Sequence, residues 1–96
     1  MNFPIHFTRD LPEVRGVVLP DGDLFGALAT ALQFPEYFGQ NWDAVADALS
    51  DVGEVMLVVR DAGARWKESP DEMRALVDVW LDAAQDRNDL ELVFVW

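Results

Sequence analysis

Residues 55–59 read VMLVV, a continuous apolar run that follows Gly53 and is rich in β-branched side chains. A run this short with this composition is typical of a central strand that is covered on both faces of a sheet. Two further stretches share its character, RGVVL at 15–19 and LELVFVW at 90–96. We expect a strand at each of the three positions.

Two helices are predicted between the first two strands. Asp23 is a plausible N-cap for a helix over 24–33, which Pro35 ends because proline cannot continue the hydrogen-bond ladder. Asn41 can cap a second helix over 42–51, since its side-chain oxygen can accept a hydrogen bond from the first turn. The aromatic stretch between these helices is expected to be an ordered loop.

A further helix is predicted over 70–86. Ser69 occupies the N-cap position and Pro70 the first helical position, a combination that is typical of helix starts. Residues 60–69 are expected to form a loop. The amino terminus, which contains the only histidine, His6, is expected to be frayed.

The predicted order is strand, helix, helix, strand, helix, strand. Helices long enough to cross over between strands imply parallel pairing. We therefore predict an α/β fold with a three-stranded parallel sheet packed with about three to four helices. We see no repeat and no linker, so residues 1–96 are expected to form a single domain.

The chain is strongly acidic. Its 96 residues include 18 acidic and 7 basic side chains, which gives a formal net charge of -11. Such a charge repels nucleic acid and anionic membranes and favours encounter with basic partners. The chain has no cysteine, no apolar stretch long enough to span a membrane and no signal-peptide pattern. We therefore expect a soluble, cytoplasmic protein.

Acidic residues are clustered along the chain. No basic residue occurs between Arg15 and Arg60, or between Arg74 and Arg87. Two rows of aspartates with helical i, i+4, i+8 spacing fall within these stretches: Asp43, Asp47 and Asp51, and Asp78, Asp82 and Asp86. Neighbouring carboxylates on one helix edge repel each other. The rows indicate either solvated helix faces or a cationic partner, and the spacing alone does not separate the two.

Catalysis and metal binding find little support. Asp43 and Asp47 lie one helical turn apart, but the sequence indicates no apolar pocket that would raise the pKa of one of them. We find no Ser/His/Asp set, phosphate-binding glycine loop or HExxH motif. A linear row of aspartates also lacks the converging loop of a usual divalent-cation site. We expect no enzyme activity, no metal and no cofactor.

The segment 23–49 resembles the barstar family, intracellular inhibitors of barnase-type ribonucleases. Its most specific part is FPEYFGQNWDAVADAL at residues 34–49, and the resemblance extends over about 17–94. It implies a three-stranded parallel sheet with packed helices. It also implies one-to-one inhibition of a basic ribonuclease or RNase toxin, in the role of an immunity protein or antitoxin. The alternative is a barstar-like module that binds another basic protein without inhibiting a ribonuclease.

The resemblance further implies which residues contact the partner. Inhibitors of this family block the ribonuclease active site with the second helix and the loop before it. Asp47 is then the leading candidate for the phosphate-binding site, with Asp43 beside it and Tyr37 on the catalytic histidine. The other contacts implied are Phe38, Gly39, Asn41 and Trp42 at the loop edge, Ser50 and Asp51 at the far rim, and Asp82 and Asp86 on the next helix.

Two positions depart from barstar itself. Ala46 stands where barstar has a bulky aromatic residue beside the key aspartate, and Trp42 stands where it has an aliphatic one. The contact surface is therefore reshaped, which leaves the particular ribonuclease open. Asn41 and Trp42 each fit a structural role as well as a contact. Gly39 is expected to serve a backbone conformation that only glycine adopts cheaply.

Overall fold

A computed structural model describes residues 4–9, 16–35 and 39–96 of the chain. The elements in this part are β1 (Ile5–Thr8), β2 (Val17–Val18), α1 (Leu24–Leu32), α2 (Trp42–Asp51), β3 (Val55–Val59), α3 (Ala62–Glu68), α4 (Pro70–Ala84) and β4 (Leu90–Val95). None of these helices is long and apolar enough to cross a bilayer.

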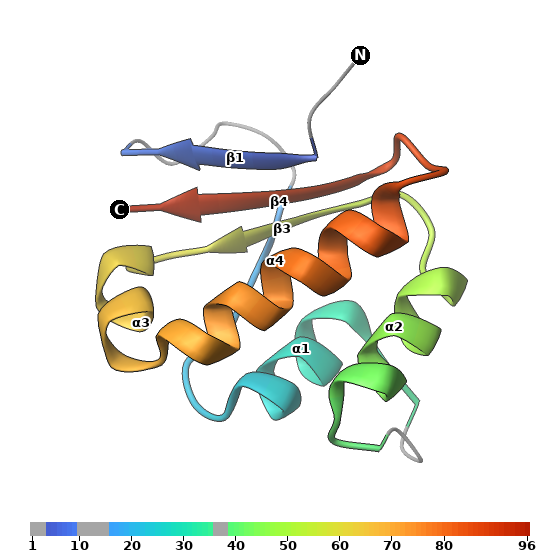
Figure 1. Cartoon of the computed structure of the whole chain (residues 1–96), viewed down its shortest axis with the longest axis horizontal. Coiled ribbons are helices and arrows are strands. Elements are labelled where there is room, and N and C mark those ends of the chain that lie inside the picture. The colour runs from blue at the N-terminus through green and yellow to red at the C-terminus, as the bar shows by residue number, and fades with distance from the viewer. Residues whose placement is uncertain (1–3, 10–15, 36–38) are drawn as a thin grey trace.

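The strands form one parallel sheet in the order β1-β4-β3-β2, and the main helices cover one of its faces (Figure 1). The prediction of an α/β fold with a parallel sheet is confirmed. The sheet has one strand more than the three expected, because β1 pairs with the outer edge of β4 in the register Ile5↔Leu92.

The expectation of a frayed amino terminus was wrong for residues 5–8. The stretch IHFT is too short to show a clear alternation of apolar and polar side chains. Its order comes from tertiary structure, because β1 satisfies the backbone groups along the edge of β4 and buries Ile5.

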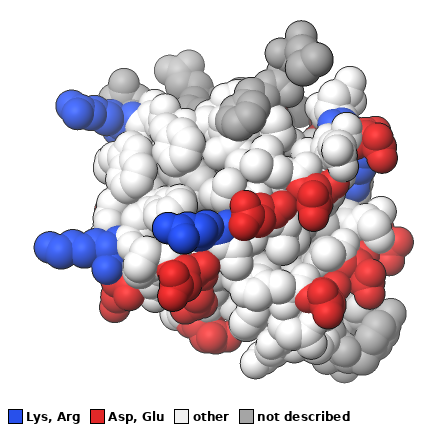
Figure 2. All heavy atoms as spheres, viewed as in Figure 1, with Lys and Arg blue, Asp and Glu red and all other residues white. Residues whose placement is uncertain are grey.

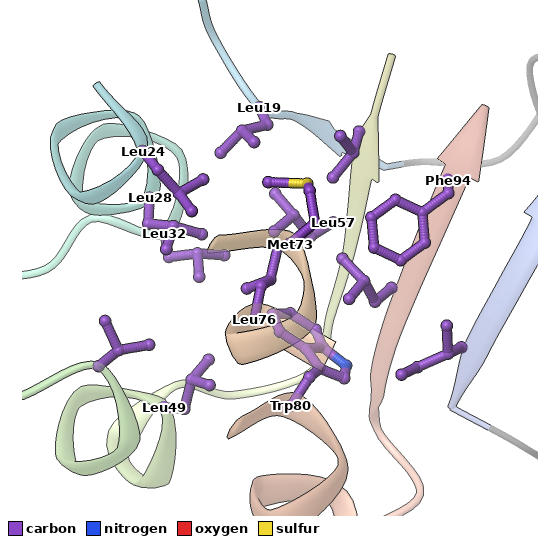
Figure 3. Packing of buried hydrophobic residues seen from close by; sticks show 14 of the residues in the cluster. Leu19, Leu24, Leu28, Leu32, Leu49, Leu57, Met73, Leu76, Trp80 and Phe94 are labelled. Carbon is purple, nitrogen blue, oxygen red and sulfur yellow. The ribbon is translucent and has the colours of Figure 1, made fainter. Parts of the chain in front are cut away.

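The core lies between the sheet and the helices (Figure 3). Leu57 of β3 and Phe94 of β4 point to the helix side, where they meet side chains of α1, α2 and α4. Neighbouring strand residues such as Val58 and Val93 point to the opposite face and are also buried. The prediction that residues 55–59 form a strand covered on both faces is therefore confirmed. The largest helix side chains in this core are Leu28, Leu49, Met73, Leu76 and Trp80.

The N-caps of α1 and α2 are those predicted. The Asp23 carboxylate accepts a hydrogen bond from the Gly26 amide at 3.1 Å, and the Asn41 side-chain oxygen accepts one from the Ala44 amide at 2.8 Å. α2 has the predicted bounds. α1 ends one residue earlier than predicted, where Gln33 takes a left-handed conformation with φ 57°.

Residues 60–69 were wrongly expected to be a loop, since they contain the short helix α3. Its signal was weak because it has only seven residues and includes a glycine. Tertiary contacts hold it instead. The Trp66 ring meets Phe94 edge to face at 5.7 Å, and Arg65 donates a hydrogen bond to the carbonyl of Pro20 at 2.8 Å.

The other bounds differ slightly from the prediction. β2 has two residues rather than five, β4 ends at Val95, and α4 ends at Ala84 rather than at residue 86. Pro70 occupies the first turn of α4 as predicted. Ser69 takes the N-cap position, but its side chain makes no capping hydrogen bond.

Replacing Leu76 should show how strongly this core holds the fold. Leu76 on α4 is fully buried, so Leu76→Ala removes apolar contacts and leaves a cavity. We expect the free energy of unfolding, measured by urea titration, to fall by about 2–5 kcal/mol. Asp78→Ala on the exposed side of the same helix is the control, with an expected change within about 0.5 kcal/mol. Equal losses for the two variants would contradict this description of the core.

Candidate protein-binding site

One side of α2 is a continuous exposed surface. Asp43, Ala46, Asp47, Ser50 and Asp51 are all exposed, and their spacing places them along the same side of the helix. The opposite side packs into the core through two fully buried residues of the helix. α2 thus brings five of the predicted contact residues together on one rigid element.

Two residues at the start of α2 have structural roles in this arrangement. Asn41 is exposed and caps the helix. Trp42 is half-buried, and its ring meets Phe25 of α1 edge to face at 5.0 Å. Trp42 therefore fastens α2 to α1.

Gly39 lies close to the residue that caps α2. A Cβ at position 39 would lie 3.2 Å from the side-chain nitrogen of Asn41. The backbone amide of Asn41 also donates a hydrogen bond to the Gly39 carbonyl at 2.8 Å. The glycine leaves room for the capping side chain. Tyr37 and Phe38, the other two predicted loop contacts, lie outside the described residues.

Asp82 and Asp86 lie at the end of α4 and just beyond it, and both are exposed. Because α2 packs against α4, the two rows of aspartates occupy neighbouring elements. Figure 2 shows acidic side chains running over α4 and α2. In the same view most basic side chains lie toward the end of the molecule near α3, where acidic side chains lie among them.

None of these six aspartates forms an ion pair with another described residue. Within the described part of the chain, two pairs come within ion-pair distance, His6 with Glu91 at 3.5 Å and Arg87 with Asp89 at 2.8 Å. Neither involves α2. The carboxylates of Asp43 and Asp47 are therefore available to a partner.

Arg87 fixes the carboxyl end of α2. Its guanidinium donates to the carbonyls of Leu49 at 2.9 Å and Val52 at 2.6 Å, and it binds both carboxylate oxygens of Asp89 at 2.8 and 2.9 Å. The hydrogen bond from Arg87 lowers the pKa of the Asp89 carboxyl, and the same bond raises the pKa of Arg87. Carbonyls at a helix end have no partner within the helix, and a cation there interacts favourably with the helix dipole.

This role of Arg87 was not predicted from the sequence, in which Arg87 only marked the end of a stretch without basic residues. The residue lies 38 positions from Leu49 in the chain, so only the tertiary structure brings the two together.

A groove of about 670 Å³ adjoins the acidic side of α2. It lies between the carboxyl end of α1, α2 and the segment that leads into β3, and we call it the α1–α2 groove. It is lined by Val17, Ala31, Leu32, Gln33, Phe34, Pro35, Gly39, Ala44, Asp47, Ala48, Asp51, Val52, Gly53, Glu54 and Val55. This groove was not predicted from the sequence, because its walls come from segments that are separate along the chain.

A second hollow, of about 520 Å³, lies where β2 and β3 end. The carboxyl edge of a parallel sheet is a common ligand site. Here, however, Arg60 and Arg65 are mixed with acidic side chains, so the hollow lacks a single sign of charge. Among the described residues, no group of three or more acidic or histidine side chains is arranged to hold a metal ion.

Fold and surface together define a class of protein, a small parallel α/β protein that presents a row of exposed carboxylates along one helix. A family model described as Barstar (barnase inhibitor) matches residues 17–95. The match spans most of the 96 residues, and the chain belongs to the barstar family. No curated protein matches the chain.

Arg87→Gln should loosen the end of α2. The shorter, neutral side chain cannot bridge the carbonyls of α2 and Asp89, so we expect the free energy of unfolding to fall by about 1–3 kcal/mol in urea titrations. Arg74→Gln removes an equal charge from the exposed side of α4 and serves as the control. Hydrogen exchange at the last amides of α2 should become faster in Arg87→Gln alone. Unchanged exchange there would refute the role given to Arg87.

Proposed function

We propose that this protein is a cytoplasmic, one-to-one inhibitor of a barnase-type ribonuclease or RNase toxin, and that it acts as an immunity protein or antitoxin. The observation that carries this proposal is the exposed side of α2 in a member of the barstar family, where Asp43 and Asp47 have no cationic partner within the described residues. The protein itself has no catalytic role in this proposal.

The chemistry of the target explains why carboxylates suit this task. A ribonuclease holds the RNA phosphate with cationic side chains, and a carboxylate can form charge-assisted, often bidentate hydrogen bonds with the same groups. Asp47 enters the phosphate-binding site and Asp43 binds beside it. RNA is then excluded because its position is occupied. Tyr37, Phe38, Gly39, Trp42, Ser50 and Asp51 complete the proposed contact surface around these two residues.

Preorganisation of α2 supports a tight complex. Asn41 caps its amino end, Arg87 binds its carboxyl end, and Val45 and Leu49 anchor it in the core. A helix that is already held in its binding geometry loses little conformational freedom when the partner docks.

The uneven distribution of charge supports rapid association. α2 contains acidic residues and no basic ones, and Arg87 near its carboxyl end is paired with Asp89. Arg65 and Lys67 lie on α3, at the other end of the molecule (Figures 1 and 2). A partner with a basic active site is therefore attracted toward α2. We assign Asp82 and Asp86 mainly to this long-range attraction.

The identity of the ribonuclease depends on the reshaped surface. Ala46 is exposed beside Asp47 and offers only a methyl group where barstar has a bulky aromatic residue. The inhibitor is thus expected to fit a ribonuclease with a different contour at this point. The alternative function, a module that binds another basic protein, uses the same acidic surface without blocking RNA cleavage.

RNA cleavage assays with barnase and related basic microbial ribonucleases test the proposal. Purified protein should abolish cleavage by its target at a one-to-one molar ratio, and size-exclusion chromatography should show the matching complex. If no ribonuclease of this kind is slowed at micromolar inhibitor, the proposal fails. Binding to a basic protein without loss of cleavage would favour the alternative module.

Two aspartate variants test the ranking of contacts. Asp47→Ala and Asp86→Ala remove the same charge from exposed positions, the first within α2 and the second just beyond the end of α4. Removing one member of a desolvated charge pair costs about 2–5 kcal/mol in protein interfaces. We expect Asp47→Ala to raise the inhibition constant accordingly, mainly through faster dissociation. Asp86→Ala should slow association a few-fold at low salt, and equal effects of the two variants would refute the ranking.

A further inference from the structure

The walls of the α1–α2 groove are largely apolar. Its lining includes Ala44 and Ala48 of α2, Ala31 and Leu32 of α1, and Val55 of β3. The two alanines of α2 are half-buried and carry only methyl groups, so they leave space between the helices. The groove is comparable in volume to pockets that hold whole organic ligands, and it can take in a long side chain with part of its backbone.

The rim of the groove is anionic. Asp47 and Asp51 lie one turn apart on α2, and Glu54 follows just after the helix. All three are exposed, and no described residue forms an ion pair or hydrogen bond with their carboxylates. None of the described residues that line the groove is basic. A carboxylate rim over apolar walls repels anions and favours a ligand with a cationic end and an apolar stem.

Arginine fits this combination best among protein side chains. Its aliphatic stem can lie along the methyl groups of Ala44 and Ala48 while its guanidinium stays at the rim. The planar guanidinium can form paired, charge-assisted hydrogen bonds with the Asp51 and Glu54 carboxylates at the rim. Lysine offers a point charge without these planar contacts.

We propose that the α1–α2 groove is a specificity subsite that receives an arginine side chain of the ribonuclease bound at α2. The inference rests on the proposed inhibitory function. Asp47 belongs both to the exposed side of α2 and to the rim of the groove, so the two surfaces are continuous. The arginine comes from a segment next to the ribonuclease active site. It gives affinity that depends on Glu54, a residue outside the aspartate rows.

The dissociation rate of the complex with barnase, measured by surface plasmon resonance, tests the charge of the rim. Glu54→Gln should speed dissociation about tenfold, because it removes one carboxylate partner of the guanidinium. Glu68→Gln is the matched control, since Glu68 is an exposed glutamate on α3 outside the groove. Both variants lose one negative charge, and the dissociation rate is compared because long-range attraction acts mainly on association.

Ala48→Leu tests the space in the groove without any change of charge. The added carbon atoms narrow the groove, so dissociation should again become faster, while urea titration checks that the fold is kept. Arginine-to-alanine variants of barnase then identify the partner residue. One arginine should show a coupling energy with Glu54→Gln in a double-mutant cycle and none with Glu68→Gln.

The outcomes separate the subsite from the inhibitory function. A wild-type protein that does not bind barnase overturns the proposed function for this target, and the subsite falls with it. A wild-type protein that binds, together with a Glu54→Gln variant that dissociates like Glu68→Gln, overturns the subsite alone. Faster dissociation of Ala48→Leu with no arginine coupled to Glu54 also overturns it, because the occupant is then not an arginine.

Discussion

Burial of one apolar face of the β3–β4 pair beneath α1, α2 and α4 is the constraint on which this structure depends. The chain has 96 residues and no cysteine, so a single core without disulfides must hold the fold. Leu57 and Phe94 on the sheet belong to the same buried cluster as side chains of all three helices, which lie on one side of the sheet. That arrangement places α2 against α4 and so brings the two rows of aspartates onto neighbouring elements.

The acidic surface creates a second requirement, which Arg87 meets. Aspartates along one edge of α2 repel each other, and Asp51 stands in the last turn, where the helix dipole disfavours an anion. Arg87 places a cation against the terminal carbonyls of α2 from below the exposed surface. The helix is thus held at its carboxyl end without covering the carboxylates of Asp43 and Asp47. Arg87 therefore stabilises the end of α2 while the proposed binding surface stays exposed.

Local sequence signals predicted the elements that carry strong capping or composition patterns. Asp23 and Asn41 begin their helices as expected, and residues 55–59 form the expected strand. The errors fall where the local signal was weak. α3 is held by the contact of Trp66 with Phe94, and β1 by pairing with β4, so both depend on residues distant in the chain.

The sequence by itself determined the fold class, the barstar family and the row of aspartates on α2, because each follows from residues close together in the chain. It indicated that the row would be exposed, and the structure places Asp43, Asp47 and Asp51 at the surface. Tertiary structure alone decided that Trp42 packs on Phe25, that Arg87 binds the end of α2, and that Glu54 borders a groove. The physical reason is that a helix cap or a row of aspartates on one helix needs only residues close together in the chain. The contacts of Arg87 with α2 and the α1–α2 groove exist only after distant segments have packed together.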